Sequence, residues 1–156
     1  MTHKVVIDNN SITNIKKMIN SNMNYIIVKD FSSNMCTRVV VKTNVGTVEI
    51  ISNTLYCEKF DEDSVIKVTE NKDSNYGIDG NKVKTITLNK IIEDIYIIKD
   101  VVKIKHNNDI CCIEQDIGIV FQLIDNSIDT IETENKKDIE CLKNSNIFLK
   151  TIRKNC

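Results

Sequence analysis

The sequence predicts a strand-rich α+β domain, built as an antiparallel sheet or a two-layer β-sandwich of about eight to ten short strands. β-branched residues gather in short segments, polar turn residues separate these segments, and one stretch near the start has apolar residues at helical spacing. An all-β sandwich is the alternative. A chain of 156 residues without a linker or an internal repeat is typical of a single globular domain over 1–156.

The first elements expected are a strand and a helix. Residues 4–7 are β-branched and precede an Asp-Asn-Asn turn, which fits a short strand. An amphipathic helix is expected over 11–20, with Asn10 or Ser11 as its cap. The apolar residues that recur at helical spacing are Ile12, Ile15, Met18 and Ile19.

Strands are expected from residue 25 onward. The clearest feature is a β-hairpin over 37–42 and 47–51, because the residues between them include Asn44 and Gly46, which tolerate positive φ. The other strands expected in the first half are 25–28, 54–56, 64–69 and 82–88.

The second half predicts a meander of short antiparallel strands. The expected strands are 95–98, 101–105, 110–113, 117–124 and 128–132, with turns at 99–100, 106–109 and 125–126. Residues 117–124 are apolar on both faces, which is typical of a central strand covered on both sides. Residues 101–105 alternate apolar and lysine side chains, which indicates one wet face. A shorter helix is expected over 136–143, and residues 147–152 fit either a last strand or a helical turn.

Charge and composition disfavour several classes of partner. The formal net charge is −1 with both signs scattered, and the only arginines are Arg38 and Arg153, so nucleic-acid binding is not expected. No export signal or membrane-spanning run is found, so we expect a cytoplasmic protein. Heavy use of Ile, Asn and Lys, without Ala, Pro or Trp, follows AT-rich codons and suggests a low-GC bacterial, phage or viral genome.

Neither a metal site nor a cofactor is expected. The six cysteines contain no CxxC pair, so we expect reduced thiols. His106 precedes Cys111 and Cys112, but adjacent residues of a strand point to opposite faces, which disfavours a zinc site. An acidic cluster lacks the EF-hand pattern and fits a solvated turn. Its residues are Glu58, Asp61, Glu62 and Asp63.

A binding role is the function that the sequence favours. The loop over 70–81 is long and polar and holds an aromatic residue beside glycines, as binding loops often do, although a hairpin tip without function has the same composition. The candidate ligand- or partner-binding residues are Lys72, Asp73, Tyr76, Asp79 and Arg38.

We therefore expect a non-enzymatic binding protein, such as a regulator or inhibitor encoded by a phage or mobile element. It would act through a sheet surface, a pocket or the 70–81 loop, on a protein or a small-molecule ligand, and a homo-oligomer is compatible with the sequence. One alternative is a small hydrolase that uses an Asp, a Glu or a Cys such as Cys57 or Cys112 with His106 or His3. The second alternative is a structural or assembly subunit.

Overall fold

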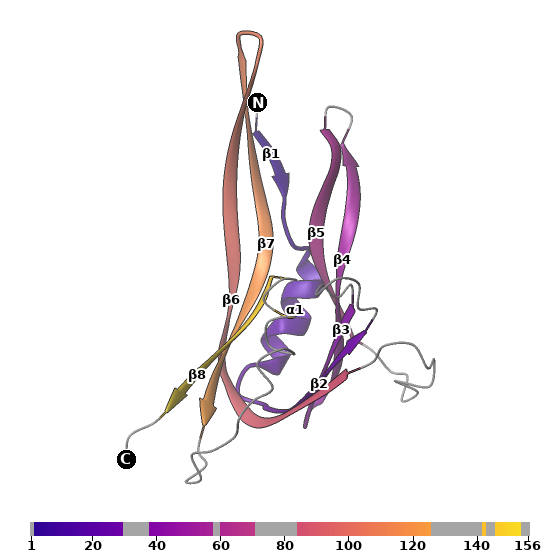
Figure 1. Cartoon of the computed structure of the whole chain (residues 1–156), viewed down its shortest axis with the longest axis vertical. Coiled ribbons are helices and arrows are strands. Elements are labelled where there is room, and N and C mark those ends of the chain that lie inside the picture. Colours follow the sequence, from indigo (N-terminus) through magenta and orange to yellow (C-terminus); the bar gives the residue numbers. More distant parts are fainter. Residues whose placement is uncertain are drawn as a thin grey trace.

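The computed structural model describes residues 2–29, 38–57, 60–70, 84–125, 142 and 146–153. Within this part of the chain, one curled sheet of eight strands wraps around a helix (Figure 1). The elements are β1 (Thr2–Val5), α1 (Asn9–Met18), β2 (Asn22–Lys29), β3 (Arg38–Thr43), β4 (Gly46–Cys57), β5 (Phe60–Glu70), β6 (Lys84–His106), β7 (Asp109–Asp125) and β8 (Ile147–Arg153). The strand-rich prediction is confirmed.

The sheet is mixed, whereas the sequence predicted antiparallel neighbours. Its order is β1-β7-β6-β2-β3-β4-β5, and β8 also pairs with β7. The strands β1 and β8 both run parallel to β7 and lie one after the other on the same edge of it. The described residues thus form one curled sheet and do not show the predicted two-layer sandwich. The predicted strand over 128–132 lies outside the described residues, and so does the predicted helix over 136–143 except for Leu142.

The predicted N-terminal helix is confirmed, but it begins at Asn9, so the predicted caps Asn10 and Ser11 lie inside it. Asp8 caps it, because its carboxylate accepts the backbone N–H of Ser11 at 2.8 Å. Ile15 and Met18 are buried against the sheet. Asn20 adopts a positive φ of 69° just after the helix, and this turns the chain into β2.

The predicted turn at Lys99-Asp100 does not form. Lys99 pairs across the sheet with Asp116, and Asp100 pairs with Gln115, so β6 continues without a break to His106. Both Lys99 and Asp100 are exposed, and charged residues are tolerated in a strand whose side chains face water. These two charged residues therefore belong to a solvent-exposed part of the strand and do not mark its end.

The predicted strands 110–113 and 117–124 are likewise one strand, β7. A two-residue turn, Asn107-Asn108, joins it to β6, in agreement with the predicted turn over 106–109. The register shifts between Ile98 and Lys99, where β7 carries the additional residue Ile117. The two strands together form a long hairpin that rises above the body of the sheet in Figure 1.

The core lies on the concave side of the sheet, around α1. β7 is a central strand, as predicted: Ile119, Phe121 and Leu123 are fully buried, whereas Val120 and Gln122 on its other face are half-buried. The residues with no exposed surface are Met23, Ile26, Val28, Val41, Ile92, Ile119, Phe121, Leu123 and Leu142. No helix in the described part of the chain has both the length and the apolar character that crossing a membrane requires.

Candidate functional site

The candidate binding residues of the 70–81 loop, Lys72, Asp73, Tyr76 and Asp79, lie outside the described residues. Arg38 is described and begins β3. Its exposed guanidinium lies on the sheet surface, where Nε is 3.6 Å from Oε1 of Glu49. This pair is a partly solvated ion pair between neighbouring strands, the kind that contributes little to stability.

The residues of the hydrolase alternative are only partly described. His106 is the last residue of β6 and its backbone pairs with Asp109, but its side chain lies outside the description. Cys111 and Cys112 are half-buried free thiols at successive positions of β7. Among the described residues, no group of three or more His, Cys, Asp and Glu side chains could hold a metal ion.

The surface best suited to binding is the upper part of the long hairpin, which we call the β6–β7 arm and define as residues 93–117. It begins where β6 loses its neighbour β2. The N–H of Asn20 donates to the carbonyl of Ile92 at 2.7 Å, and the N–H of Ile92 donates to the carbonyl of Ser21 at 2.8 Å. Beyond Ile92, no described strand pairs with this edge of β6. The N–H of Ile95 on this edge donates to Oδ1 of its neighbour Asp94 at 2.8 Å. Farther along the edge, no described strand pairs with the backbone groups of Val101 and Lys103, which are therefore available to a partner.

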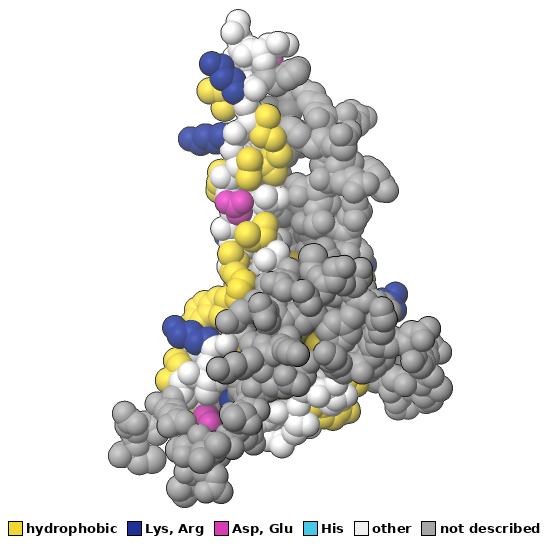
Figure 2. Space-filling model, in the orientation of Figure 1, with side chains coloured by type: hydrophobic (Ala, Val, Ile, Leu, Met, Phe, Trp, Pro, Cys, Tyr) yellow, Lys and Arg dark blue, Asp and Glu magenta, His cyan; other side chains and the backbone are white. Residues whose placement is uncertain are grey.

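Apolar side chains are exposed along the β6–β7 arm. Val101 is 55% exposed and Ile110 is 60% exposed, and Tyr96 near the base is 48% exposed. Figure 2 shows hydrophobic side chains in a stripe along the arm, with lysines at its margin. The exposed residues Lys103 and Lys105 alternate with half-buried neighbours, as the sequence predicted for 101–105. Val101 and Ile110 lie on the same face of the arm, because Ile110 pairs with Lys105, whereas Tyr96 lies on the other face. Exposed apolar side chains such as Val101 and Ile110 are typical of interaction surfaces.

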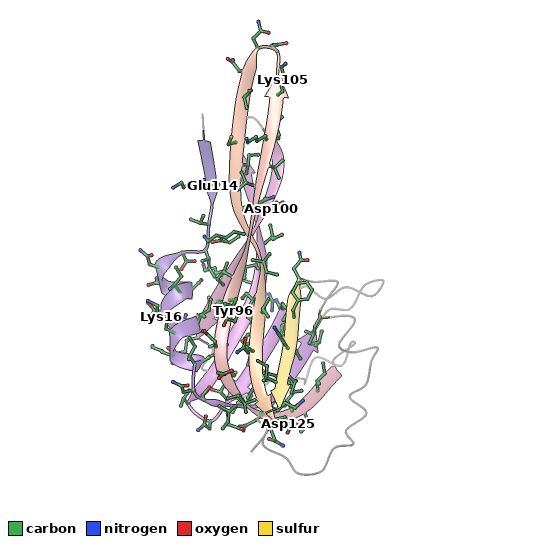
Figure 3. The ribbon with its side chains drawn as sticks, turned by 90° about the vertical axis from the view of Figure 1, so that its left-hand side faces the viewer. Lys16, Tyr96, Asp100, Lys105, Glu114 and Asp125 are labelled. Atoms are coloured by element: carbon green, nitrogen blue, oxygen red, sulfur yellow. The ribbon has the colours of Figure 1, made fainter. Side chains whose placement is uncertain are left out.

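Tyr96 belongs to a row of side chains that crosses three strands. The register places Tyr96 opposite Val120 of β7, and Val120 opposite Phe148 of β8. The neighbouring carboxylate of Asp94 raises the pKa of Tyr96, because negative charge beside the phenol disfavours its ionisation. The phenol therefore stays neutral at physiological pH. Figure 3 shows Tyr96, Asp100 and Lys105 at successive heights along the arm.

A buried carboxylate ties the β6–β7 arm to the body of the protein. Asp116, only 1% exposed, accepts the backbone N–H of Ile7 at 2.8 Å and contacts Nζ of Lys99 at 3.1 Å. It occupies the gap on the edge of β7 between the residues paired with β1 and those paired with β8. Asp116 therefore joins β7 to β6 and to the segment around Ile7 at the level of Lys99.

Sequence reasoning missed the β6–β7 arm, because it split both of its strands at their charged residues. One signal was available: β-branched residues predominate on both sides of Lys99-Asp100, as in a strand, and turn residues typical of a hairpin follow at Asn107-Asn108. The arm offers exposed apolar side chains, exposed lysines and open backbone groups, which are the components of recognition by strand addition. No protein-family model, curated protein or solved structure matches the chain.

Proposed function

We propose that the protein is a non-enzymatic binding protein that recognises another protein through the β6–β7 arm. The observation that carries the proposal is the combination of exposed Val101 and Ile110 with a strand edge that no described strand covers. Apolar contacts supply affinity and the backbone groups of an open edge supply direction and register, as in recognition by strand addition.

Anchoring of the arm at Asp116 supports this role. Asp116 joins the arm to the segment around Ile7, and Gly118 lets β8 approach β7 closely just below it. A surface held in one conformation before binding loses less entropy when a partner docks. The arm is thus suited to present its side chains in a fixed arrangement.

The test is site-specific photo-crosslinking in cells that naturally express the chain. A photoreactive amino acid replaces Val101 or Ile110 on the arm, and the matched control carries it at Val45, which is 63% exposed at the turn between β3 and β4. We expect discrete protein adducts from positions 101 and 110 and none from position 45. Adducts that are equally strong from all three positions, or absent from the two arm positions, would overturn the proposal.

A further inference from the structure

The open edge of β6 presents backbone groups at every second residue. The two strands of the arm are joined by the two-residue turn Asn107-Asn108, and the residues on either side of this turn pair with each other. A turn of this length makes the closing pair a hydrogen-bonded one, and the backbone groups then alternate in direction along the strand. The N–H and C=O groups of Val101, Lys103 and Lys105 therefore point away from β7, toward the open edge.

The part of this edge that suits a partner is its upper part, residues 99–105, which we call the upper edge. Lower on the strand, the N–H of Ile95 already donates to Oδ1 of Asp94 at 2.8 Å. The register with β7 shifts between Ile98 and Lys99, and such an irregularity increases the local twist of a strand pair. From Lys99 onward the pairing with β7 is regular. An extended stretch of this length spans about 23 Å, at roughly 3.3 Å for each residue.

One face of the arm carries an excess of positive charge. The side chains of Lys103 and Lys105 lie on this face, because alternate residues of a strand point the same way. The acidic side chains that β7 contributes to it, Asp116 and Glu114, each contact another lysine already, at 3.1 Å and 3.9 Å respectively. Lys103 and Lys105 are exposed and form no ion pair with any described residue. A partner at the upper edge therefore meets two lysines whose charge no described side chain balances.

We infer that the partner at the upper edge is an extended segment of another protein with acidic residues at alternate positions; this inference rests on the proposed function of the arm. Residues directly opposite each other in paired strands share a face, so acidic residues opposite Lys103 and Lys105 reach both lysines. Apolar residues belong opposite the exposed Val101 and opposite the half-buried Val102 and Ile104. The segment thus has an apolar residue between its two acids and apolar residues beside them.

A protein segment matches the upper edge better than a phosphate-bearing ligand does. The backbone of Val101 and Lys103 offers donors and acceptors together, and an extended peptide carries both. A phosphate group carries acceptors for the lysines and the N–H groups, but its oxygens give nothing to the C=O groups. Lysines on an edge normally oppose strand pairing. Here they disfavour neutral and basic segments, and an acidic segment is the one that gains from them.

Other described edges of the sheet are shorter or partly occupied. β1 has 4 residues and β8 has 7, and short edges resist pairing. The edge of β5 is engaged by α1, because the N–H of Val68 donates to Oγ of Ser11 at 2.9 Å and Nδ2 of Asn14 donates to the carbonyl of Val68 at 2.9 Å. The upper edge of β6 is therefore the edge best suited to strand addition.

A blocked synthetic peptide with the sequence valine, valine, glutamate, valine, glutamate, valine, valine tests the inference. It reads the same in both directions, so it fits the edge as a parallel or an antiparallel strand. The control peptide has the same composition with its two glutamates adjacent, so that they point to opposite faces and one at most meets a lysine. NMR titration of the purified full chain measures the affinity. Lys103→Glu removes one lysine, and Lys150→Glu is its control, at an exposed site on β8 away from the arm.

We expect saturable changes in the amide shifts of the upper edge when the alternating peptide is added at millimolar concentration. The control peptide should bind about threefold more weakly, and Lys103→Glu should weaken the alternating peptide about three- to tenfold, because an attraction between strands becomes a repulsion. Lys150→Glu should bind the alternating peptide as the unchanged chain does. Since Lys103 is exposed and has no described ion pair, the variant should keep its fold, which the same spectra check.

Several results would overturn the acidic segment as partner: no binding of the alternating peptide, equal binding of the two peptides, or unchanged affinity in Lys103→Glu. Sedimentation of the chain with vesicles of phosphatidylserine and phosphatidylcholine, without peptide binding, would assign the lysines to an anionic membrane surface instead. Photo-crosslinking from Val101 tests the proposed function separately. Discrete protein adducts without a preference between the peptides would remove this inference alone, whereas the lack of both adducts and peptide binding would overturn both.

Discussion

Gly118 of β7 lies close against the backbone of Asn146, the residue that precedes β8. A Cβ at this position would lie 2.7 Å from the backbone oxygen of Asn146 and 3.1 Å from Cδ1 of Ile98. The same carbonyl of Asn146 accepts the N–H of Ile119 at 3.0 Å, so it cannot move without losing that hydrogen bond. Glycine is required here because of close approach of backbone to backbone.

Gly118→Ala should therefore lower the free energy of unfolding by about 1–3 kcal/mol, the usual cost of forcing extra atoms into a packed site. Gly46→Ala is the matched control, because a Cβ at Gly46 meets no atom within 4 Å. The control should change stability by no more than about 0.5 kcal/mol. Urea unfolding of both variants gives the comparison, and equal stabilities would contradict the account of Gly118.

Asparagine performs the role that glycine has in most chains. The non-glycine residues with positive φ in the described part of the chain are all asparagines: Asn20, Asn89, Asn107 and Asn146. Asn20 follows α1, and Asn89 lies at the bulge of β6 beside β2. Asn107 lies in the turn of the arm, and Asn146 precedes β8. Asparagine tolerates this conformation better than other side chains do. The abundance of Asn follows the codon bias, so the sequence alone did not reveal which of these residues shape the backbone.

At the scale of single elements, local signals predicted well. The helix was found because its apolar residues have the right spacing, and the hairpin of β3 and β4 was found because turn residues lie between two β-branched runs. The break predicted at Lys99-Asp100 was wrong. Charged residues indicate exposure to water, and an exposed stretch of a strand accommodates them as readily as a turn does. Of the predicted site residues, Arg38 is the one that the structure describes.

The cap of α1 makes a pH-dependent contribution to stability. The backbone N–H of Ser11 donates to the carboxylate of Asp8 and holds the pKa of Asp8 below its ordinary value of 3.8. A lowered carboxyl pKa means that the folded state favours the ionised form. The contribution is therefore fully present above the ordinary value and is lost as the pH falls through the folded-state pKa.

Asp8→Ala should lower the free energy of unfolding by about 1 kcal/mol at neutral pH, and Asp8→Asn by less, because asparagine also caps helices. The difference between the unchanged chain and Asp8→Ala should shrink from about pH 5 to about pH 2, whereas the difference between Asp8→Asn and Asp8→Ala should stay constant. Urea titrations at each pH measure both differences. A gap between the unchanged chain and Asp8→Ala that is independent of pH would show that the charge of Asp8 has no part in capping.

At the scale of the whole molecule, the edge strand β5 and the β6–β7 arm differ in whether their outer backbone groups have partners. Side chains of α1, Ser11 and Asn14, occupy the backbone groups of β5 at Val68, whereas the arm leaves an edge of β6 open. The sequence could not predict this difference, because it depends on pairings between distant segments: β1 with β7, β8 with β7, and α1 with β5. Such contacts leave no periodic signal in a single chain.

Amide hydrogen exchange of β6, followed residue by residue by NMR in dilute protein, tests the open edge most directly. We expect the amides of Val102 and Ile104 to be protected, because they point toward β7. The amides of Val101 and Lys103 should exchange fast, because they point toward the open edge. Protection of Val101 and Lys103 equal to that of Val102 and Ile104 would contradict the account.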